Sequence, residues 1–320
     1  MIGITELTYI SMISFFMVVI LGPIFIPMLA KFKFGQTVRT DGPQTHLAKN
    51  GTPTMGGVIM IVAIIITGLT RSKVSSDMWV GLLCITGFGF VGFLDDFIKI
   101  KMKRSLGLKA YQKIVLQFAL AFYVSYYQYT TSASASQLLI PFTDATINLG
   151  PLYIPVMMFI IIGTVNAVNL TDGLDGLASG VTLIVSTFFM ILAGSIGNSD
   201  VAILAAATVG ACLGFLGFNS YPAKVFMGDT GSMALGGAVV AFAVLTNSVL
   251  LIPIVGGIYF AEAISVILQV GSYKLTKKRI FKMAPIHHHF EQCGWPETRV
   301  VFVFWIITVV LSWIGIISVF

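Results

Sequence analysis

Ten long apolar stretches limit this chain to folds that bury most of their helices in lipid. They cover residues 7–29, 54–70, 78–98, 112–130, 152–170, 177–195, 201–219, 232–248, 250–271 and 300–319. A helix needs roughly 17–25 mainly apolar residues to cross a bilayer. Only 10% of the 320 residues are charged, whereas soluble domains contain about 25%. The sequence therefore predicts an all-α integral membrane protein with about ten transmembrane helices, in a single polytopic domain over residues 1–320.

Basic residues gather in four of the predicted linkers. Linkers 31–53, 99–113, 220–231 and 272–299 hold 17 of the 19 lysine and arginine residues, and all four face one side in a ten-helix arrangement. Cytoplasmic loops of membrane proteins collect Lys and Arg, so this side is predicted to be cytoplasmic and both termini to be outside. The net charge of +6 follows from this topology and from attraction to anionic lipid. We therefore expect membrane lipid, and no nucleic acid, as a partner.

Acidic residues cluster next to predicted helix ends on the same side. They occur in the segments FLDDFIK, NLTDGLDGLA and FMGDTGS, which contribute Asp95, Asp96, Asp172, Asp175 and Asp229. Ionisable groups at membrane depth are costly and usually face a cavity or a partner. Mg²⁺ is typically held by one or two carboxylates together with substrate phosphates, and the nearby linkers offer lysines for phosphate. This combination predicts phosphoryl transfer to or from a lipid at the cytoplasmic face.

Two of these segments are expected to place acids at helix ends. Asp95 and Asp96 are predicted to close the third helix, where adjacent side chains point about 100° apart, so that one would face the site and the other support it. Asp229 is predicted just before the eighth helix, where free backbone N–H groups could hold phosphate beside a metal-bound carboxylate. The structural alternatives are a solvated acidic pair and a simple helix cap.

The third segment combines amides with acids. Asn166 and Asn169 are predicted on the end of the fifth helix, and Asp172 and Asp175 on the tight turn that follows, because Asp-Gly is a turn signal. A turn alone does not require two asparagines beside it. We therefore expect these four side chains to line the site.

A run of three histidines, His287, His288 and His289, lies in the segment PIHHHFE. Consecutive residues of regular structure point in different directions, and Mg²⁺ prefers oxygen ligands over imidazole. Pro285 and Pro296 predict a loop around the run. We expect the imidazoles to donate hydrogen bonds to nucleotide–sugar phosphates, with at least one facing outward. A solvated polar loop is the alternative. Glu262 and Gln269 share a face of the ninth segment and either line the site or pack between helices.

Five segments resemble, in order, the phospho-N-acetylmuramoyl-pentapeptide transferase family. They are KNGTPTMGG (49–57), FLDDFIK (93–99), NAVNLTDGLDGLA (166–178), NSYPAKVFMGDTGSMALGG (219–237) and PIHHHFE (285–291). The resemblance implies a homodimer in the bacterial plasma membrane that uses Mg²⁺. It also implies the transfer of phospho-MurNAc-pentapeptide from UDP-MurNAc-pentapeptide to undecaprenyl phosphate, which gives lipid I and UMP.

The resemblance also implies roles for individual residues. Asp229 would bind Mg²⁺, and it would form the catalytic set with Asp95, Asp96, His287 and His288. The implied substrate-binding residues are Lys49, Thr54, Lys113, Asn166, Asn169, Asp172, Asp175, Asn219, Phe226, Gln269 and His289, with Phe226 stacked on uracil. Phosphate monoesters have a second pKa near ~6, so the acceptor needs no strong base, and Asp95 is expected to orient phosphate.

Two other functions stay open from the sequence. A related transferase for GlcNAc-1-phosphate would use the same acidic segments, although the histidine run and the whole-chain likeness argue against it. A proton-coupled secondary transporter would place its binding site near the membrane midplane, whereas the acids of this chain gather at one predicted face.

Overall fold

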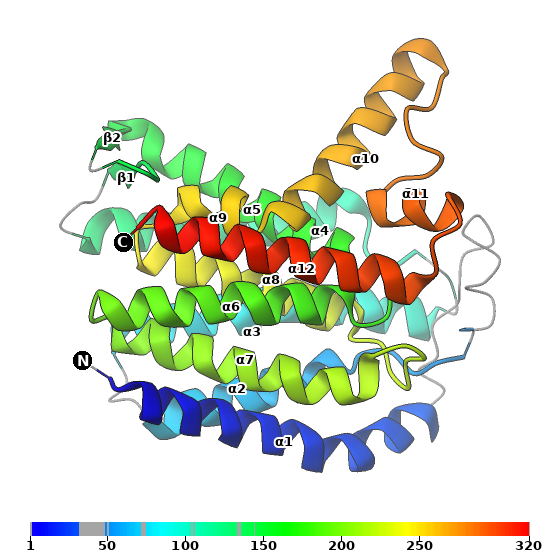
Figure 1. Ribbon diagram of the computed structural model, residues 1–320, viewed down its shortest axis with the longest axis horizontal. Coiled ribbons are helices and arrows are strands. Elements are labelled where there is room, and N and C mark those ends of the chain that lie inside the picture. The colour runs from blue at the N-terminus through cyan, green and yellow to red at the C-terminus, as the bar shows by residue number, and fades with distance from the viewer. Residues whose placement is uncertain are drawn as a thin grey trace.

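A computed structural model gives an almost entirely helical fold (Figure 1). It describes residues 2–31, 49, 51–71, 75–102, 104, 106–132, 136–143 and 145–319. The long helices are α1 (Ile4–Lys31), α2 (Gly57–Arg71), α3 (Ser76–Lys101), α4 (Ala110–Thr131), α5 (Tyr153–Thr171), α6 (Leu177–Ser195), α7 (Ser199–Asn219), α8 (Gly228–Leu245), α10 (Gly257–Thr276) and α12 (Glu297–Ile317). This confirms the predicted all-α membrane class.

Short elements connect these helices. They are the 3₁₀ turns η2 (Gly150–Leu152) and η3 (Val249–Leu251), the short helices α9 (Ile252–Val255) and α11 (Ile286–Gln292), and the strands β1 (Gln137–Leu139) and β2 (Thr146–Asn148). The two strands pair antiparallel. The prediction of a loop around the histidines was wrong, because the run forms α11 and Pro285 precedes its first turn. Of the basic residues in the four linkers, Lys33, Arg39 and Lys103 lie outside the described residues.

All ten predicted segments are helical in the described part of the chain, but not all of these helices are long and apolar enough to cross a membrane. By length and hydropathy, seven described helices could cross a membrane, and an eighth could if α9 and α10 form one span bent by 83°. Pro253, Gly256 and Gly257 lie at this bend, where proline and glycine interrupt a regular helix. Helix α2 is a shorter apolar helix. Ten crossings therefore remain a prediction.

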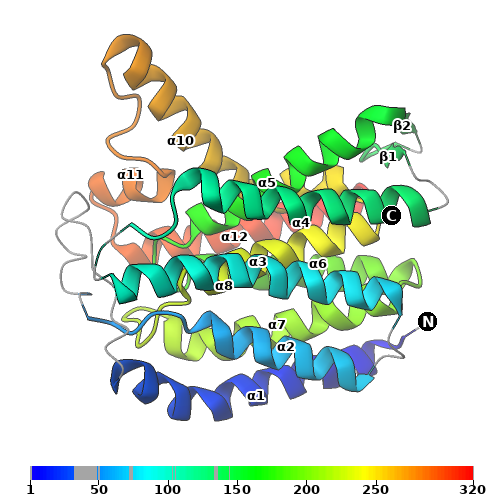
Figure 2. The ribbon, with the colours of Figure 1, turned by 180° about the vertical axis from the view of Figure 1, so that it is seen from behind.

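The helices lie side by side, except that α10 projects away from the bundle (Figures 1 and 2). Both termini and the β1–β2 hairpin lie at one end of the bundle, and α11 and the start of α12 lie at the other. Large apolar side chains such as Ile24, Phe159 and Phe302 are exposed on its outside. An apolar exterior of this extent marks a surface that contacts lipid or protein.

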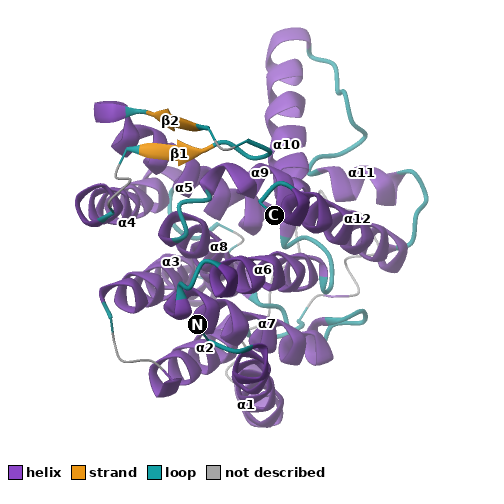
Figure 3. Cartoon of the chain, turned by 60° about the vertical axis from the view of Figure 1, so that its left-hand side comes forward, coloured by secondary structure: helices purple, strands orange, loops and turns teal. Residues whose placement is uncertain are grey.

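Helix α8 lies at the centre of the bundle, between α3, α5 and α6 (Figure 3). Almost all of its residues are buried. Glycine allows α3 to approach it closely, because a Cβ on Gly92 would lie only 2.0 Å from the backbone oxygen of Asp229. Small residues commonly permit such contacts between membrane helices. This contact fixes the first turn of α8 against the end of α3.

Candidate active site

Three carboxylates from two helices meet where α3 contacts the start of α8. One ligand oxygen from each of Asp95, Asp96 and Asp229 lies within 4.8 Å of the others. We call these three residues the acidic cluster. The predicted convergence of the α3 and α8 acids is confirmed, but the predicted helix ends were wrong. Helix α3 continues to Lys101, and α8 begins at Gly228, so that Asp229 lies in its first turn. Lys99 and Lys101 favour the continuation, because cations stabilise the C-terminal turn of a helix.

Two lysine ammonium groups lie within the acidic cluster. Lys99 Nζ is 2.7 Å from Asp95 Oδ2, 3.1 Å from Asp229 Oδ2 and 3.8 Å from Asp96 Oδ1. Lys113 Nζ, from α4, is 2.8 Å from the same oxygen of Asp229. The carboxylates thus already converge on a cation. Their oxygen-only donor set fits Mg²⁺, which prefers hard oxygen ligands.

The two acids of α3 each use one oxygen to hold neighbouring backbone. Asp96 Oδ2 accepts hydrogen bonds from the Thr230 backbone N–H at 2.9 Å and from its hydroxyl at 2.8 Å. Asp95 Oδ1 accepts the Leu108 N–H at 2.8 Å. The other oxygen of each carboxylate faces Lys99. The expectation that one acid faces the site while the other supports it was therefore wrong, because each acid does both.

Only one of the two predicted asparagines on α5 reaches the acidic cluster. Asn169 Nδ2 donates to Asp229 Oδ1 at 3.1 Å and to the Ser232 hydroxyl at 2.7 Å. Asn166 Nδ2 instead donates to Gln117 Oε1 on α4 at 2.6 Å. Asn169 therefore orients the proposed metal ligand, and Asn166 ties α5 to α4.

The turn between α5 and α6 carries the other acidic pair, as predicted. Burial raises the pKa of Asp172 well above its ordinary value, and the negative charges of Asp229, Asp96 and Asp175 raise it further. Lys49 opposes this shift. Asp172 is thus within electrostatic reach of both the acidic cluster and Lys49.

Asp172→Asn is expected to raise the thermal unfolding midpoint near neutral pH. A raised pKa means that the folded chain binds the proton more tightly than the unfolded chain. Stability then falls as pH rises above the ordinary carboxyl pKa of about 3.9. Asparagine cannot ionise, so its advantage should be small at pH 4 and grow toward pH 8. Thermal unfolding of purified protein with a chelator measures this, with Asp200→Asn as the control. Parallel pH profiles for Asp172→Asn and the unmodified chain would contradict the shift.

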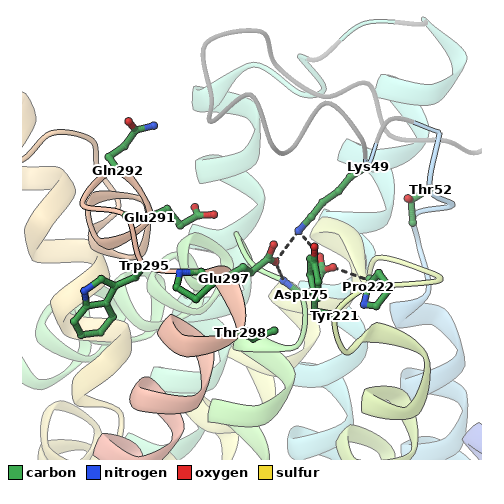
Figure 4. Close-up of a pocket in the computed structure, with 13 residues that line it drawn as sticks. Lys49, Thr52, Asp175, Tyr221, Pro222, Glu291, Gln292, Trp295, Glu297 and Thr298 are labelled. Atoms are coloured by element: carbon green, nitrogen blue, oxygen red, sulfur yellow. Dashed lines mark hydrogen bonds and ion pairs between the residues drawn. The ribbon is translucent and has the colours of Figure 1, made fainter.

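A cavity of about 640 Å³ opens beside Asp175 (Figure 4). Its lining includes Lys49, Asp175, Tyr221, Glu291, Trp295 and Glu297. Lys49 Nζ lies 2.7 Å from Asp175 Oδ1 and 2.6 Å from Glu297 Oε1 (Figure 4). Burial alone would lower the pKa of Lys49, but its hydrogen bonds to these carboxylates and their charges raise it. Lys49 therefore stays protonated at neutral pH.

Glu297 is a site residue that the sequence reasoning missed. Its Oε1 also accepts the backbone N–H of Asp175 at 2.7 Å, so one carboxylate oxygen holds both Lys49 and the turn. The only signal in the sequence was an acid at the first position of a helix after Pro296, which is also a common capping feature.

Asn219 and Phe226 shape the backbone around this cavity. Asn219 is buried, and its Oδ1 accepts hydrogen bonds from the Gly176 N–H and the Ser179 hydroxyl, both at 3.1 Å. Its Nδ2 donates to the Val225 carbonyl at 3.0 Å. Phe226 is half-buried, and its backbone N–H donates to the carbonyl before Thr54 at 2.8 Å. These contacts bring Thr54 beside Gly228, where α8 begins.

The three histidines have different surroundings. His287 is buried, and its Nδ1 lies 3.0 Å from Glu262 Oε1 on α10. His288 Nδ1 lies 2.7 Å from Glu291 Oε2, at the edge of the cavity. His289 Nδ1 accepts the Lys282 backbone N–H at 3.1 Å. The run is thus bonded to protein groups and does not form a solvated loop.

Gln269 holds the segment that follows α10. Its Oε1 accepts the backbone N–H groups of Ile280 and Phe281, each at 3.0 Å, and its Nε2 donates to the Phe281 carbonyl at 2.9 Å. Among the described residues, these bonds connect Gln269 to this segment and not to the acidic cluster.

Comparison with known proteins agrees with these features. Residues 78–247 match glycosyl transferase family 4, and residues 49–61 match phospho-N-acetylmuramoyl-pentapeptide-transferase signature 1. A phospho-N-acetylmuramoyl-pentapeptide-transferase of Clostridioides difficile (strain 630) is 81% identical over 100% of both chains. Proteins of the same name from Alkaliphilus metalliredigens (strain QYMF) and Alkaliphilus oremlandii (strain OhILAs) are 54% and 55% identical, over 98% of each chain. The chain therefore belongs to the phospho-N-acetylmuramoyl-pentapeptide-transferase family.

Proposed function

We propose that this chain transfers phospho-MurNAc-pentapeptide from UDP-MurNAc-pentapeptide to undecaprenyl phosphate, forming lipid I and UMP for peptidoglycan synthesis. The names of its relatives support phospho-MurNAc-pentapeptide as the group that is transferred. The observation that carries the proposal is the acidic cluster, in which three carboxylates from α3 and α8 converge with Lys99 and Lys113. Such a site can gather phosphates from two substrates.

The main obstacle to this reaction is repulsion between two anions. The acceptor phosphate is largely ionised at neutral pH, since its second pKa is near ~6, and the donor carries a pyrophosphate. Lys99 and Lys113 supply positive charge at Asp229. Asp229, with Asp95 and Asp96, would hold Mg²⁺, which would add positive charge where the phosphates meet. Positioning and charge neutralisation then account for most of the catalysis.

Asp95 fits a positioning role better than that of a general base. Its carboxylate lies 2.7 Å from Lys99 Nζ and accepts the Leu108 N–H. An acceptor that is already ionised has little need of a base. We propose that Asp95 holds Lys99 in place for phosphate.

The cavity beside Asp175 is proposed to hold the uridine. Uracil offers an N–H donor that Asp175 can accept, and Phe226, which follows the lining segment 221–223, is proposed to stack on the ring. Asn219 would act by holding the turn at Gly176, because its amide is buried and bonded to protein. We retain the other predicted substrate contacts as proposals, namely Lys49, Thr54, Lys113, Asn166, Asn169, Asp172, Gln269, His288 and His289.

The proposed setting is the plasma membrane of a bacterium, with the active site on the cytoplasmic side and the chain in a homodimer. The basic linkers support this orientation. The positions of the chain termini also agree with this orientation, since both termini lie at one end of the bundle and α11 lies at the other (Figure 1).

Glu297→Ala is expected to raise the KM for the UDP-linked donor by about 10- to 100-fold, because charged hydrogen bonds are worth about 1.5–3 kcal/mol. The change removes one of the two carboxylates that hold Lys49, and it leaves the Asp175 N–H without its acceptor. Glu297→Gln keeps an acceptor oxygen and should have the smaller effect. Steady-state kinetics with Glu6→Gln as control measures both. Equal KM values for the alanine variant and the unmodified chain would exclude this role.

The proposed reaction predicts which phosphate moves. Purified protein with undecaprenyl phosphate and a donor labelled in the phosphate next to the sugar should pass the label to lipid and release UMP. Release of UDP would instead show ordinary glycosyl transfer. Uptake of the donor into vesicles without labelled lipid would show a transporter.

A further inference from the structure

We infer that His287 is a positioning residue that connects α10 to the acidic turn between α5 and α6, and that it does not touch substrate. The inference deepens the proposed function and rests on it, since it concerns how the same site is held in place. It departs from the expectation that all three histidines donate to phosphates. Three contacts of His287 carry it, two made by its ring and one by its backbone N–H.

The first two contacts join His287 to Glu262. The Glu262 side chain is fully buried on α10, and the His287 side chain is 1% exposed. Glu262 Oε1 is 3.0 Å from His287 Nδ1, at ion-pair distance although not aligned as a hydrogen bond. Glu262 Oε2 accepts the His287 backbone N–H at 3.5 Å. A buried carboxylate needs such partners, so both oxygens hold residue 287 against α10.

The third contact joins His287 to the turn. A Cβ on Gly173 would lie 2.2 Å from His287 Nε2 and 2.6 Å from Cε1. Gly173 is not among the positive-φ glycines of the described residues, so it is required for space rather than for backbone conformation. The ring therefore packs directly on the backbone between Asp172 and Asp175.

These contacts leave the ring no nitrogen for substrate. Nδ1 faces Glu262, and Nε2 is buried against Gly173 with no hydrogen-bond partner in the described part of the chain. A shift of α10 or α11 would move the ring and with it the turn, whose Asp175 holds Lys49. Small displacements of catalytic groups can cost about 100-fold in rate. The position of the His287 ring therefore controls activity through the turn between α5 and α6.

A double-mutant cycle across the contact tests the inference. Gly173→Ala should lower kcat/KM by about 10- to 100-fold, because its Cβ would displace the ring. In a His287→Ala background the same change should add less than about twofold, because the ring is gone. Gly271→Ala is the control, because a Cβ on this glycine of α10 would meet no atom within 4 Å. Losses that simply multiply, or a fully active Gly173→Ala, would overturn the inference.

A doubly substituted variant separates a positioning role of His287 from direct contact with substrate. His287→Phe combined with Glu262→Met replaces the buried polar pair by apolar groups of similar size, which buried pairs often tolerate. The combined variant should recover at least about tenfold in kcat over His287→Ala, with donor KM near the unmodified value. If it folds, as thermal unfolding reports, and stays as inactive as His287→Ala, a ring nitrogen is needed and the inference fails. Absence of UMP formation by the unmodified protein would refute the proposed function instead.

Discussion

Asp229→Asn is expected to slow lipid I formation by about 10²- to 10³-fold, the loss typical of removing one preorganised electrostatic contact. Asp229 Oδ2 lies between Lys99 Nζ and Lys113 Nζ, at 3.1 and 2.8 Å, and Oδ1 accepts Asn169 Nδ2 at 3.1 Å. An amide keeps the shape of the side chain but loses the charge that pairs with both ammonium groups and would bind Mg²⁺. The lysines would then repel one another without their shared partner.

Initial rates at several Mg²⁺ concentrations measure this effect, and thermal unfolding shows whether the variant stays folded. Asp77→Asn is a matched control, because Asp77 also lies in the first turn of a long helix, α3, where it bonds the Tyr127 hydroxyl at 2.7 Å. It should keep most of the activity. Near-normal turnover of Asp229→Asn at low Mg²⁺ would show that this carboxylate is not a metal ligand.

Gly92→Ala is expected to abolish transfer and to destabilise the fold by about 1–3 kcal/mol or more, the usual cost of overpacking. The added Cβ would lie 2.0 Å from the Asp229 backbone oxygen and 2.7 Å from the Thr230 nitrogen. Both atoms belong to backbone, so no side-chain rotation relieves the clash. The first turn of α8 must move away from α3, and the acidic cluster separates with it.

Gly163→Ala is the control for this change, because a Cβ on this glycine of α5 meets no atom within 4 Å. Its unfolding midpoint and rate should match those of the unmodified chain. Unchanged unfolding and activity of Gly92→Ala would mean that α3 and α8 are not packed backbone to backbone at this point.

The helices and the convergence of the acidic cluster could be predicted from the sequence, because both follow from short segments of the chain. Apolar runs of membrane length have few alternatives to a helix, because every backbone polar group must be satisfied internally. Acids at membrane depth need partners, and Lys99 is a partner that Asp95, Asp96 and Asp229 share. Helix ends were less predictable, since Lys99, which favours the continuation of α3, also pairs with the acidic cluster.

The remaining site contacts depend on tertiary structure. Glu297 approaches Lys49 across 248 positions of sequence, and no local pattern indicates such a pair. The histidine run gives three identical residues that α11 directs to different surroundings, so the sequence cannot tell which ring is buried. The buried partner, Glu262, was noticed on α10, but its contact with His287 depends on how α10 and α11 pack.

Exchange of labelled UMP into the donor tests the central claim most directly. Because one pyrophosphate linkage replaces another of similar energy, the proposed transfer should run in reverse. Purified protein given lipid I, Mg²⁺ and labelled UMP should form labelled UDP-MurNAc-pentapeptide, and Asp229→Asn should not. If labelled UMP stays unincorporated while UDP reverses the reaction, the sugar phosphate does not move with the sugar, and the acidic cluster does not carry out phosphoryl transfer.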